Sequence, residues 1–315
     1  MKMLRAAADW WFTPMPDARV RVFRVVIYLF VVYDVLFIHN IAANHAHTGE
    51  LYRPLEIAEL LSLPQPTPVL ITAVQWTLIA SCLLSAAGWF PRVSGTIAFL
   101  AYFEWCIMSF SYGKVDHDRI ALLVALAVLP TVGRALAADR TLSAAAGWAL
   151  RCVQVAVIAT YFLSAFAKFR FGGFDWANGA TLVRAVFRRS TVFSEWMLDV
   201  PWVLHAGQWA ILLMELSAPV IFLVALRWRY AMVGMFVAFH IATYMVITIV
   251  FLPHTICLVL AFLPTEKLVW WARDRFAALR GGRTGTAPPP GGAAAGAAPS
   301  ASPSAPAAAA PAEGG

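Results

Sequence analysis

Charged residues are scarce in this chain. Of its 315 residues only 13% are Asp, Glu, Lys or Arg, whereas 61% are hydrophobic. Soluble domains carry about 25% charged residues. One aqueous core cannot bury so much apolar surface, so the composition predicts a protein whose solvent is lipid. The 24 basic residues outnumber the 17 acidic ones. No basic patch falls on a soluble segment, however, and we expect no nucleic-acid partner.

Cysteine is scarce too, and no two cysteines form a C-x-x-C motif. All four lie within apolar runs: Cys82, Cys106, Cys152 and Cys257. We expect buried thiols there, with neither a disulfide framework nor a metal site. The N-terminus carries positive charges but no apolar run before Pro14, which argues against a cleavable signal peptide.

Long apolar runs, by contrast, fill most of the chain. A bilayer crossing takes about 20 mainly apolar residues. Eight segments are candidates: 20–38, 67–88, 93–111, 118–136, 148–168, 203–226, 230–251 and 254–271. Pro253 and Pro264 interrupt the last one, which we expect to be short or broken.

These segments predict an all-α integral membrane protein, a polytopic bundle of about eight transmembrane helices. Residues 1–19 form a cytoplasmic N-terminal segment, residues 20–271 the transmembrane domain, and residues 281–315 a disordered Ala/Pro/Gly-rich tail. With both termini in the cytoplasm, two thirds of the 24 lysines and arginines lie on the inner side. This bias favours a multi-pass protein of the cell membrane, whose only certain partner is the lipid bilayer.

Ionisable residues inside or beside the spans are candidates for a site, because such groups are costly in lipid. We expect Arg24 to reach the cytoplasmic headgroups and Asp34 to pair with a neighbour. Glu215 and His240 must face the interior of the bundle. A structural polar network and a supporting role in a site are both open for them.

The segment SYGKVDHDRIALL places His117 beside Asp116 at the start of a helix. A carboxylate there can cap the helix, which accounts for the acidic residue without a functional role. The imidazole is not explained in that way. A histidine beside carboxylates can move protons near neutral pH, so His117 is a candidate for proton transfer.

The stretch SAFAKFRFGGFDW ends a long apolar run in Lys168, and Tyr161 precedes it by seven residues on the same helical face. A lysine there either reaches for the interface or acts as a base at the mouth of an apolar site. The glycine pair at 172–173 permits a tight reversal. Asp175 and Trp176 then open a segment with an apolar stripe and several arginines, which is typical of an interfacial helix and would form a lid.

Taken in order, the motifs resemble the horizontally transferred transmembrane (HTTM) domain family. Its best-known relative is the membrane domain of vitamin K-dependent gamma-glutamyl carboxylase. The resemblance runs from about residue 10 to residue 271. It rests on Val22-Phe23-Arg24, Asp34, Tyr52-Arg53-Pro54-Leu55, His117, the pattern Tyr161, Lys168, Trp176 and Gly179, the step Glu215-Leu216-Ser217-Ala218, and His240.

The resemblance implies quinol-linked oxygenation, epoxidation or carboxylation at the extracytoplasmic face, with reduced vitamin K or menaquinol and without a metal. It implies Lys168 as the base that deprotonates the quinol and His117 as its proton-handling partner. The expected pocket and its support comprise Asp34, Asp116, Tyr161, Asp175, Trp176, Glu215 and His240. The alternative is a non-enzymatic membrane protein that assists export or maturation of a secreted peptide. Enzymatic activity is therefore open at this point.

Overall fold

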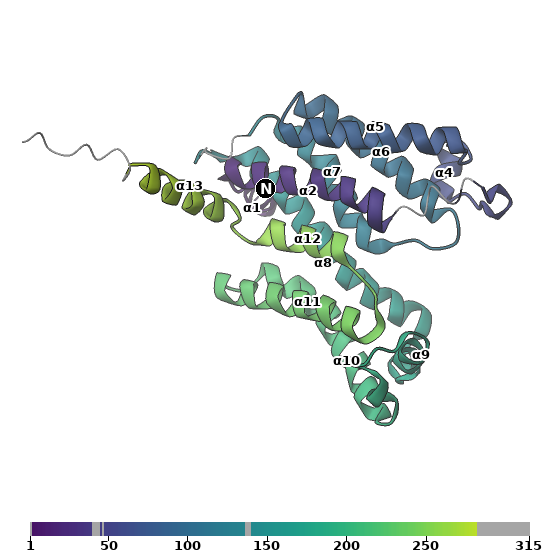
Figure 1. Cartoon of the computed structure of the whole chain (residues 1–315). Coiled ribbons are helices and arrows are strands. Elements are labelled where there is room, and N and C mark those ends of the chain that lie inside the picture. The colour runs from purple at the N-terminus through teal and green to yellow at the C-terminus, as the bar shows by residue number, and fades with distance from the viewer. Residues whose placement is uncertain (1, 40–44, 46, 136–139, 282–315) are drawn as a thin grey trace, which may run out of the picture. The chain divides into compact units, whose positions relative to one another are not determined.

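The computed structural model describes residues 2–39, 45, 47–135 and 140–281, and over these residues the fold is all-α (Figure 1). Contacts divide the chain into two compact units, residues 1–273 and residues 274–315. The major helices are α1 (Lys2–Trp11), α2 (Asp17–Tyr33), α4 (Glu56–Leu60), α5 (Pro68–Ala87), α6 (Pro91–Phe110), α7 (Ile120–Val132), α8 (Ala144–Gly172), α9 (Ala180–Arg189), α10 (Pro201–Ser217), α11 (Leu226–Ile247), α12 (Leu252–Phe262) and α13 (Glu266–Gly281).

Short elements connect these helices. The described segments include two strands of two residues each, β1 (Met15–Pro16) and β2 (Leu142–Ser143), which pair antiparallel. A π-helical turn, η1 (Asp34–Ile38), extends α2 without a break. The 3-10 turns are η2 (Gly49–Leu51), η3 (His117–Arg119), η4 (Phe174–Ala177), η5 (Glu195–Leu198) and η6 (Ala218–Phe222).

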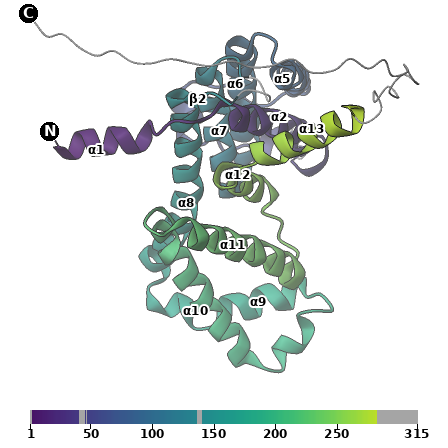
Figure 2. The ribbon, with the colours of Figure 1, turned by 90° about the vertical axis from the view of Figure 1, so that its left-hand side faces the viewer.

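A continuous apolar core joins α2, α5, α6, α7, α8 and α12. Helix α8 is the longest of the described elements, at 29 residues, which corresponds to about 43 Å. Its first half packs in this core against α7 and α12, and its C-terminal part contacts α10 and η4 (Figure 2). The side chains near the C-terminal end of α8 therefore meet a different set of neighbours from those at its start.

Helices α9, α10 and α11 form a group near this end of α8. They pack on one another through a small apolar cluster of their own. Val186 of α9, Leu204 of α10 and Ile247 of α11 are its buried members. A further small cluster joins Ala165 of α8 to Leu212 of α10. Val233 and Phe236 of α11 belong to the main core, and the cavity described below lies beside the two small clusters.

Within the described ranges, five helical segments are long and apolar enough to cross a membrane: α5, α6, α8, α10 with η6 (Pro201–Phe222), and α11. Helices α12 and α13 form a sixth segment if they count as one broken span. Their axes are bent by 69° at the interruption of the helix beside Pro264. The remaining predicted spans are helical but shorter. Helix α2 has 17 residues before η1, and α7 has 13.

The structure corrects one prediction about the first span. Arg24 does not reach towards headgroups; its side chain is buried, and Nη2 donates to the carbonyl oxygens of Leu129 and Gly133. Carbonyls at the end of a helix have no partner within the helix. Arg24 therefore satisfies the C-terminal end of α7. The predicted disordered tail, beyond Gly281, lies outside the described residues.

Candidate functional site

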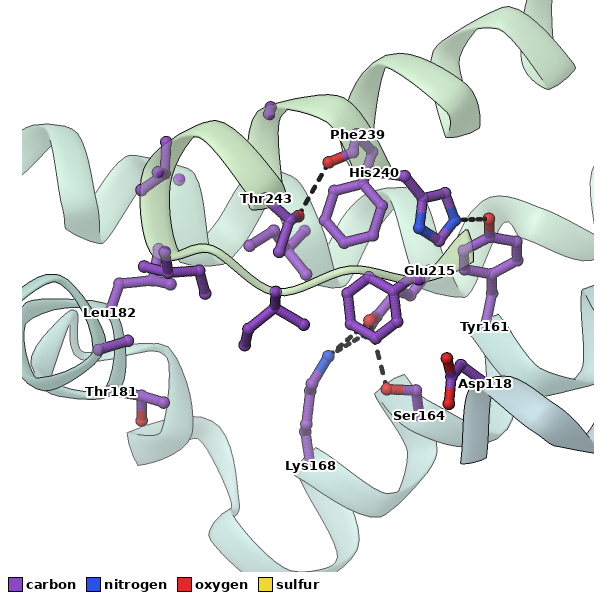
Figure 3. A pocket seen from close by; sticks show the side chains of 18 of the residues that line it. Asp118, Tyr161, Ser164, Lys168, Thr181, Leu182, Glu215, Phe239, His240 and Thr243 are labelled. Atoms are coloured by element: carbon purple, nitrogen blue, oxygen red, sulfur yellow. Dashed lines mark hydrogen bonds and ion pairs between the residues drawn. The ribbon is translucent and has the colours of Figure 1, made fainter. Parts of the chain in front are cut away.

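A cavity of about 540 Å³ lies between the C-terminal half of α8, helices α9, α10 and α11, and the segment that leads into α12 (Figure 3). Most of its lining is aliphatic or aromatic, with a few polar groups that converge on it. Sites for small molecules have volumes of about 300–1,000 Å³ and this mixture of walls. The cavity therefore has the size and the lining of a small-molecule site.

Lys168 and Glu215 form an ion pair at the cavity wall. Nζ of Lys168, on α8, lies 2.6 Å from Oε1 and 2.5 Å from Oε2 of Glu215, on α10. Ser164, one turn before Lys168, donates to Oε1 at 3.3 Å. The Lys168 ammonium also lies 4.9 Å from the ring centroid of Trp176, within the range of a cation–π contact. The pair is therefore held from three sides.

Both members of this pair are largely removed from water. The side chain of Lys168 is 20% exposed and that of Glu215 is 6% exposed. Opposite charges attract more strongly in such surroundings than in water. Moving one proton from the ammonium to the carboxylate leaves two neutral groups at no change in net charge. This pair can therefore exchange a proton internally without adding charge to an apolar cavity.

A second polar cluster comprises Tyr161 of α8, His240 of α11 and His254 of α12. The Tyr161 hydroxyl and Nε2 of His240 are 2.5 Å apart. The Tyr161 and His254 rings meet edge to face, with centroids 4.7 Å apart. All three residues are buried and line the cavity. The cluster closes one part of the cavity with aromatic rings that carry hydrogen-bonding atoms.

His117 lines the same cavity from η3, directly before α7. Its ring centroid lies 6.2 Å from that of Phe251. Partial removal from water and the nearby ammonium of Lys168 hold the pKa of His117 below its ordinary value of 6.5. The imidazole is thus neutral at neutral pH and can accept a proton.

Asp34 and Asp116 belong to a neighbouring network around Arg119 and do not line the cavity. Arg119 Nη2 lies 3.1 Å from Asp34, which also accepts a hydrogen bond from Tyr102 at 2.8 Å. Nη1 of Arg119 lies 3.5 Å from Asp116, and Asp116 lies 2.6 Å from Lys114. Asp34 is fully buried, so these contacts compensate a buried charge and join α2, α6 and η3. Asp34 is paired with neighbours, as the sequence predicts.

The segment between α8 and α9 holds Trp176 against the cavity, whereas Asp175 is exposed and does not line it. Gly173 allows the turn, since its φ of 60° and ψ of −160° are open almost only to glycine. Helix α9 follows and packs on α10 and α11. Of the two residues predicted to shape a lid, Asp175 and Trp176, only Trp176 lines the cavity.

The cavity brings together two thirds of the residues proposed from the sequence and leaves Asp34, Asp116 and Asp175 outside it. Sequence reasoning did not assign Ser164 and His254 to the site. Ser164 had a signal, because it lies between Tyr161 and Lys168 on one face of α8. His254 had no such signal in the sequence, because a single histidine after a proline does not show which neighbours it will contact in the fold. The residues brought together are His117, Tyr161, Lys168, Trp176, Glu215 and His240.

Comparison of the chain with protein-family models, with curated proteins and with solved structures found no match. The class of protein is therefore defined by fold and site alone. It is an all-α chain with five or six apolar helical segments long enough to cross a membrane. Its small-molecule cavity combines apolar walls, a lysine–glutamate pair and three histidines.

Proposed function

We propose that this protein is a multi-pass membrane enzyme that removes a proton from a neutral, largely apolar small molecule bound in the cavity. The observation that carries the proposal is the Lys168–Glu215 pair, largely buried against apolar walls in a cavity that the neutral imidazole of His117 also lines. The resemblance to the HTTM family supports a reduced quinone, such as menaquinol or reduced vitamin K, as that molecule.

Insertion into the cell membrane, with eight crossings and cytoplasmic termini, is part of the proposal. Large apolar side chains exposed along the candidate spans support it. Trp76 and Leu83 on α5 and Leu213 on α10 are examples. Such side chains are stable where lipid surrounds them. The short helices α2 with η1, α7 and α12 would supply the additional crossings.

The lining fits a reduced quinone. Leu182, Val203 and Ile211 offer aliphatic surface for a ring and an apolar chain, while Lys168 and Glu215 offer hydrogen bonds to a hydroxyl. When bound, the quinol would supply an acidic hydroxyl and the electrons for reaction with oxygen. The proton transfers described next are carried out by side chains of this chain.

Lys168 cannot accept a proton while it is an ammonium. In the proposed mechanism the ammonium first gives a proton to Glu215, which leaves a neutral amine and a neutral carboxylic acid. The amine then takes the proton of the substrate hydroxyl and becomes an ammonium again, beside the new oxyanion. His117 would accept a proton from the Lys168–Glu215 pair. Trp176 would keep Lys168 in place through the cation–π contact.

The test supplies purified protein with reduced menaquinone and oxygen and measures quinone epoxide. We expect turnover by the wild type, a loss of about 100-fold or more in Lys168→Ala, and a comparable loss in Glu215→Gln. Arg170→Ala is the matched control, because Arg170 is an exposed cation two residues from Lys168 and does not line the cavity. Equal turnover by Lys168→Ala and the wild type would show that Lys168 is not the base.

Lys168→Arg separates the enzymatic proposal from the non-enzymatic alternative. Arginine keeps a cation at this position but does not lose its proton in proteins. An enzyme that uses Lys168 as its base should be inactive as the arginine variant. A membrane protein that assists a secreted peptide, and needs only the charge, should keep its function, with no epoxide formed by any variant.

A further inference from the structure

The cluster of Tyr161, His240 and His254 has no part in the proton transfer proposed above. In Figure 3, Tyr161 and His240 lie on one side of the Lys168–Glu215 pair and Leu182 lies on the other. Tyr161 and Lys168 are seven residues apart on α8, which places them about 10 Å apart along the helix axis. The cavity thus has polar groups that are attached to α8 about two helical turns apart.

The hydrogen-bonding capacity of this cluster is only partly used. Tyr161 and Nε2 of His240 bind each other. Nδ1 of His240 and both ring nitrogens of His254 are buried and have no hydrogen-bond partner among the residues that the structure describes. His254 itself is only 2% exposed. Buried polar atoms in proteins nearly always have a partner, so these three nitrogens indicate a bound group.

The chemistry of that group follows from the imidazoles. A neutral imidazole offers one N–H donor and one nitrogen acceptor. His254 therefore binds an oxygen through one ring nitrogen, which donates or accepts according to the tautomer; a hydroxyl suits either role, and a carbonyl suits the donor. The surrounding rings also favour a flat ligand, since Phe251 meets His240 edge to face at 5.2 Å. The described part of the chain contains no group of three His, Cys, Asp or Glu placed to hold an ion.

We infer that Tyr161, His240 and His254 form a second binding subsite, in which His254 hydrogen-bonds an oxygen at the far end of the ligand that Lys168 and Glu215 hold. The ligand class is a neutral, flat ring system with one oxygen at each end and an apolar chain. This inference rests on the proposed function for the shared cavity, but not on Lys168 acting as a base.

The test measures binding and not turnover. The full chain in lipid nanodiscs is titrated without oxygen, and the part of the tryptophan quenching that Trp176→Phe removes reports occupancy of the cavity. One probe is a 1,4-dihydroxynaphthalene with an isoprenoid chain; the second lacks one hydroxyl. His254→Leu should weaken the two-hydroxyl probe about tenfold, or about 1.4 kcal/mol, and the one-hydroxyl probe less than about twofold. His254→Gln, which keeps a donor and an acceptor, should recover most of the loss.

His205→Leu is the matched control, because His205 is exposed on α10 and does not line the cavity. Equal weakening of both probes by His254→Leu, or weakening of neither, would overturn the inference. If that variant does not fold, the wild type alone decides: it should prefer the two-hydroxyl probe about tenfold, and equal affinities would count against the subsite. Loss of turnover in Lys168→Ala with equal probe affinities would keep the proposed function and reject only this subsite.

Discussion

Removal of one member of the Lys168–Glu215 pair should destabilise the protein more than removal of both. Lys168→Met leaves the carboxylate of Glu215 without its cation in a position where only 6% of the side chain is exposed. An uncompensated buried charge costs about 3–5 kcal/mol. Lys168 is 20% exposed, so water reaches part of the pair and we expect a cost below that range, about 2–3 kcal/mol.

The double variant Lys168→Met/Glu215→Gln tests the coupling. The amide replaces the carboxylate at similar volume and can still accept the hydrogen bond from Ser164. Since no charge is then buried, we expect stability within about 1 kcal/mol of the wild type. The effects of the two single changes on the free energy of unfolding would thus be non-additive by about 2 kcal/mol or more.

Thermal unfolding in one detergent, followed by circular dichroism, measures these differences. A loss of about 2–3 kcal/mol corresponds to a fall in Tm of about 3–5 °C for a chain of this size. Arg170→Met, which removes an exposed cation near the same end of α8, should leave Tm within about 2 °C. If the loss of stability in the double variant equals the sum of the losses in the two single variants, the side chains are not coupled. The proposed internal proton exchange then has no basis.

Three further predictions concern the surroundings of the pair. In Lys168→Met the pKa of His117 should rise towards 6.5, because one cause of its lowered value is the ammonium; a titration of isotope-labelled histidine by NMR measures this, and an unchanged value would contradict the proximity. In the wild type the unfolded chain protonates His117 near pH 6.5 and the folded chain only at lower pH, so this group lowers stability as pH falls below 6.5. Gly173→Ala should cost about 1–3 kcal/mol, because φ is +60° although a Cβ would meet open space. Gly234→Ala within α11, equally open, should be neutral or stabilising by comparison.

The local part of the site could be predicted from the sequence because it lies on one helix. Tyr161, Ser164 and Lys168 follow helical spacing, so they share a face of α8 in almost any packing. His117 could be placed beside a helix start from its carboxylate neighbours. The prediction for Arg24 was wrong, since a basic residue near a span end has two ways to satisfy its charge and only the position of α7 selects between them.

Composition and apolar run lengths by themselves determined an all-α chain with helices long enough to cross a membrane, because backbone groups in lipid must be satisfied within each segment. The tertiary structure alone decided that Glu215 meets Lys168 across 47 residues of sequence and that His254 lines the same cavity. It also placed Asp34 and Asp116 with Arg119 instead. Partner choice between distant helices depends on their packing and crossing geometry, which hydrophobic periodicity along one helix does not specify.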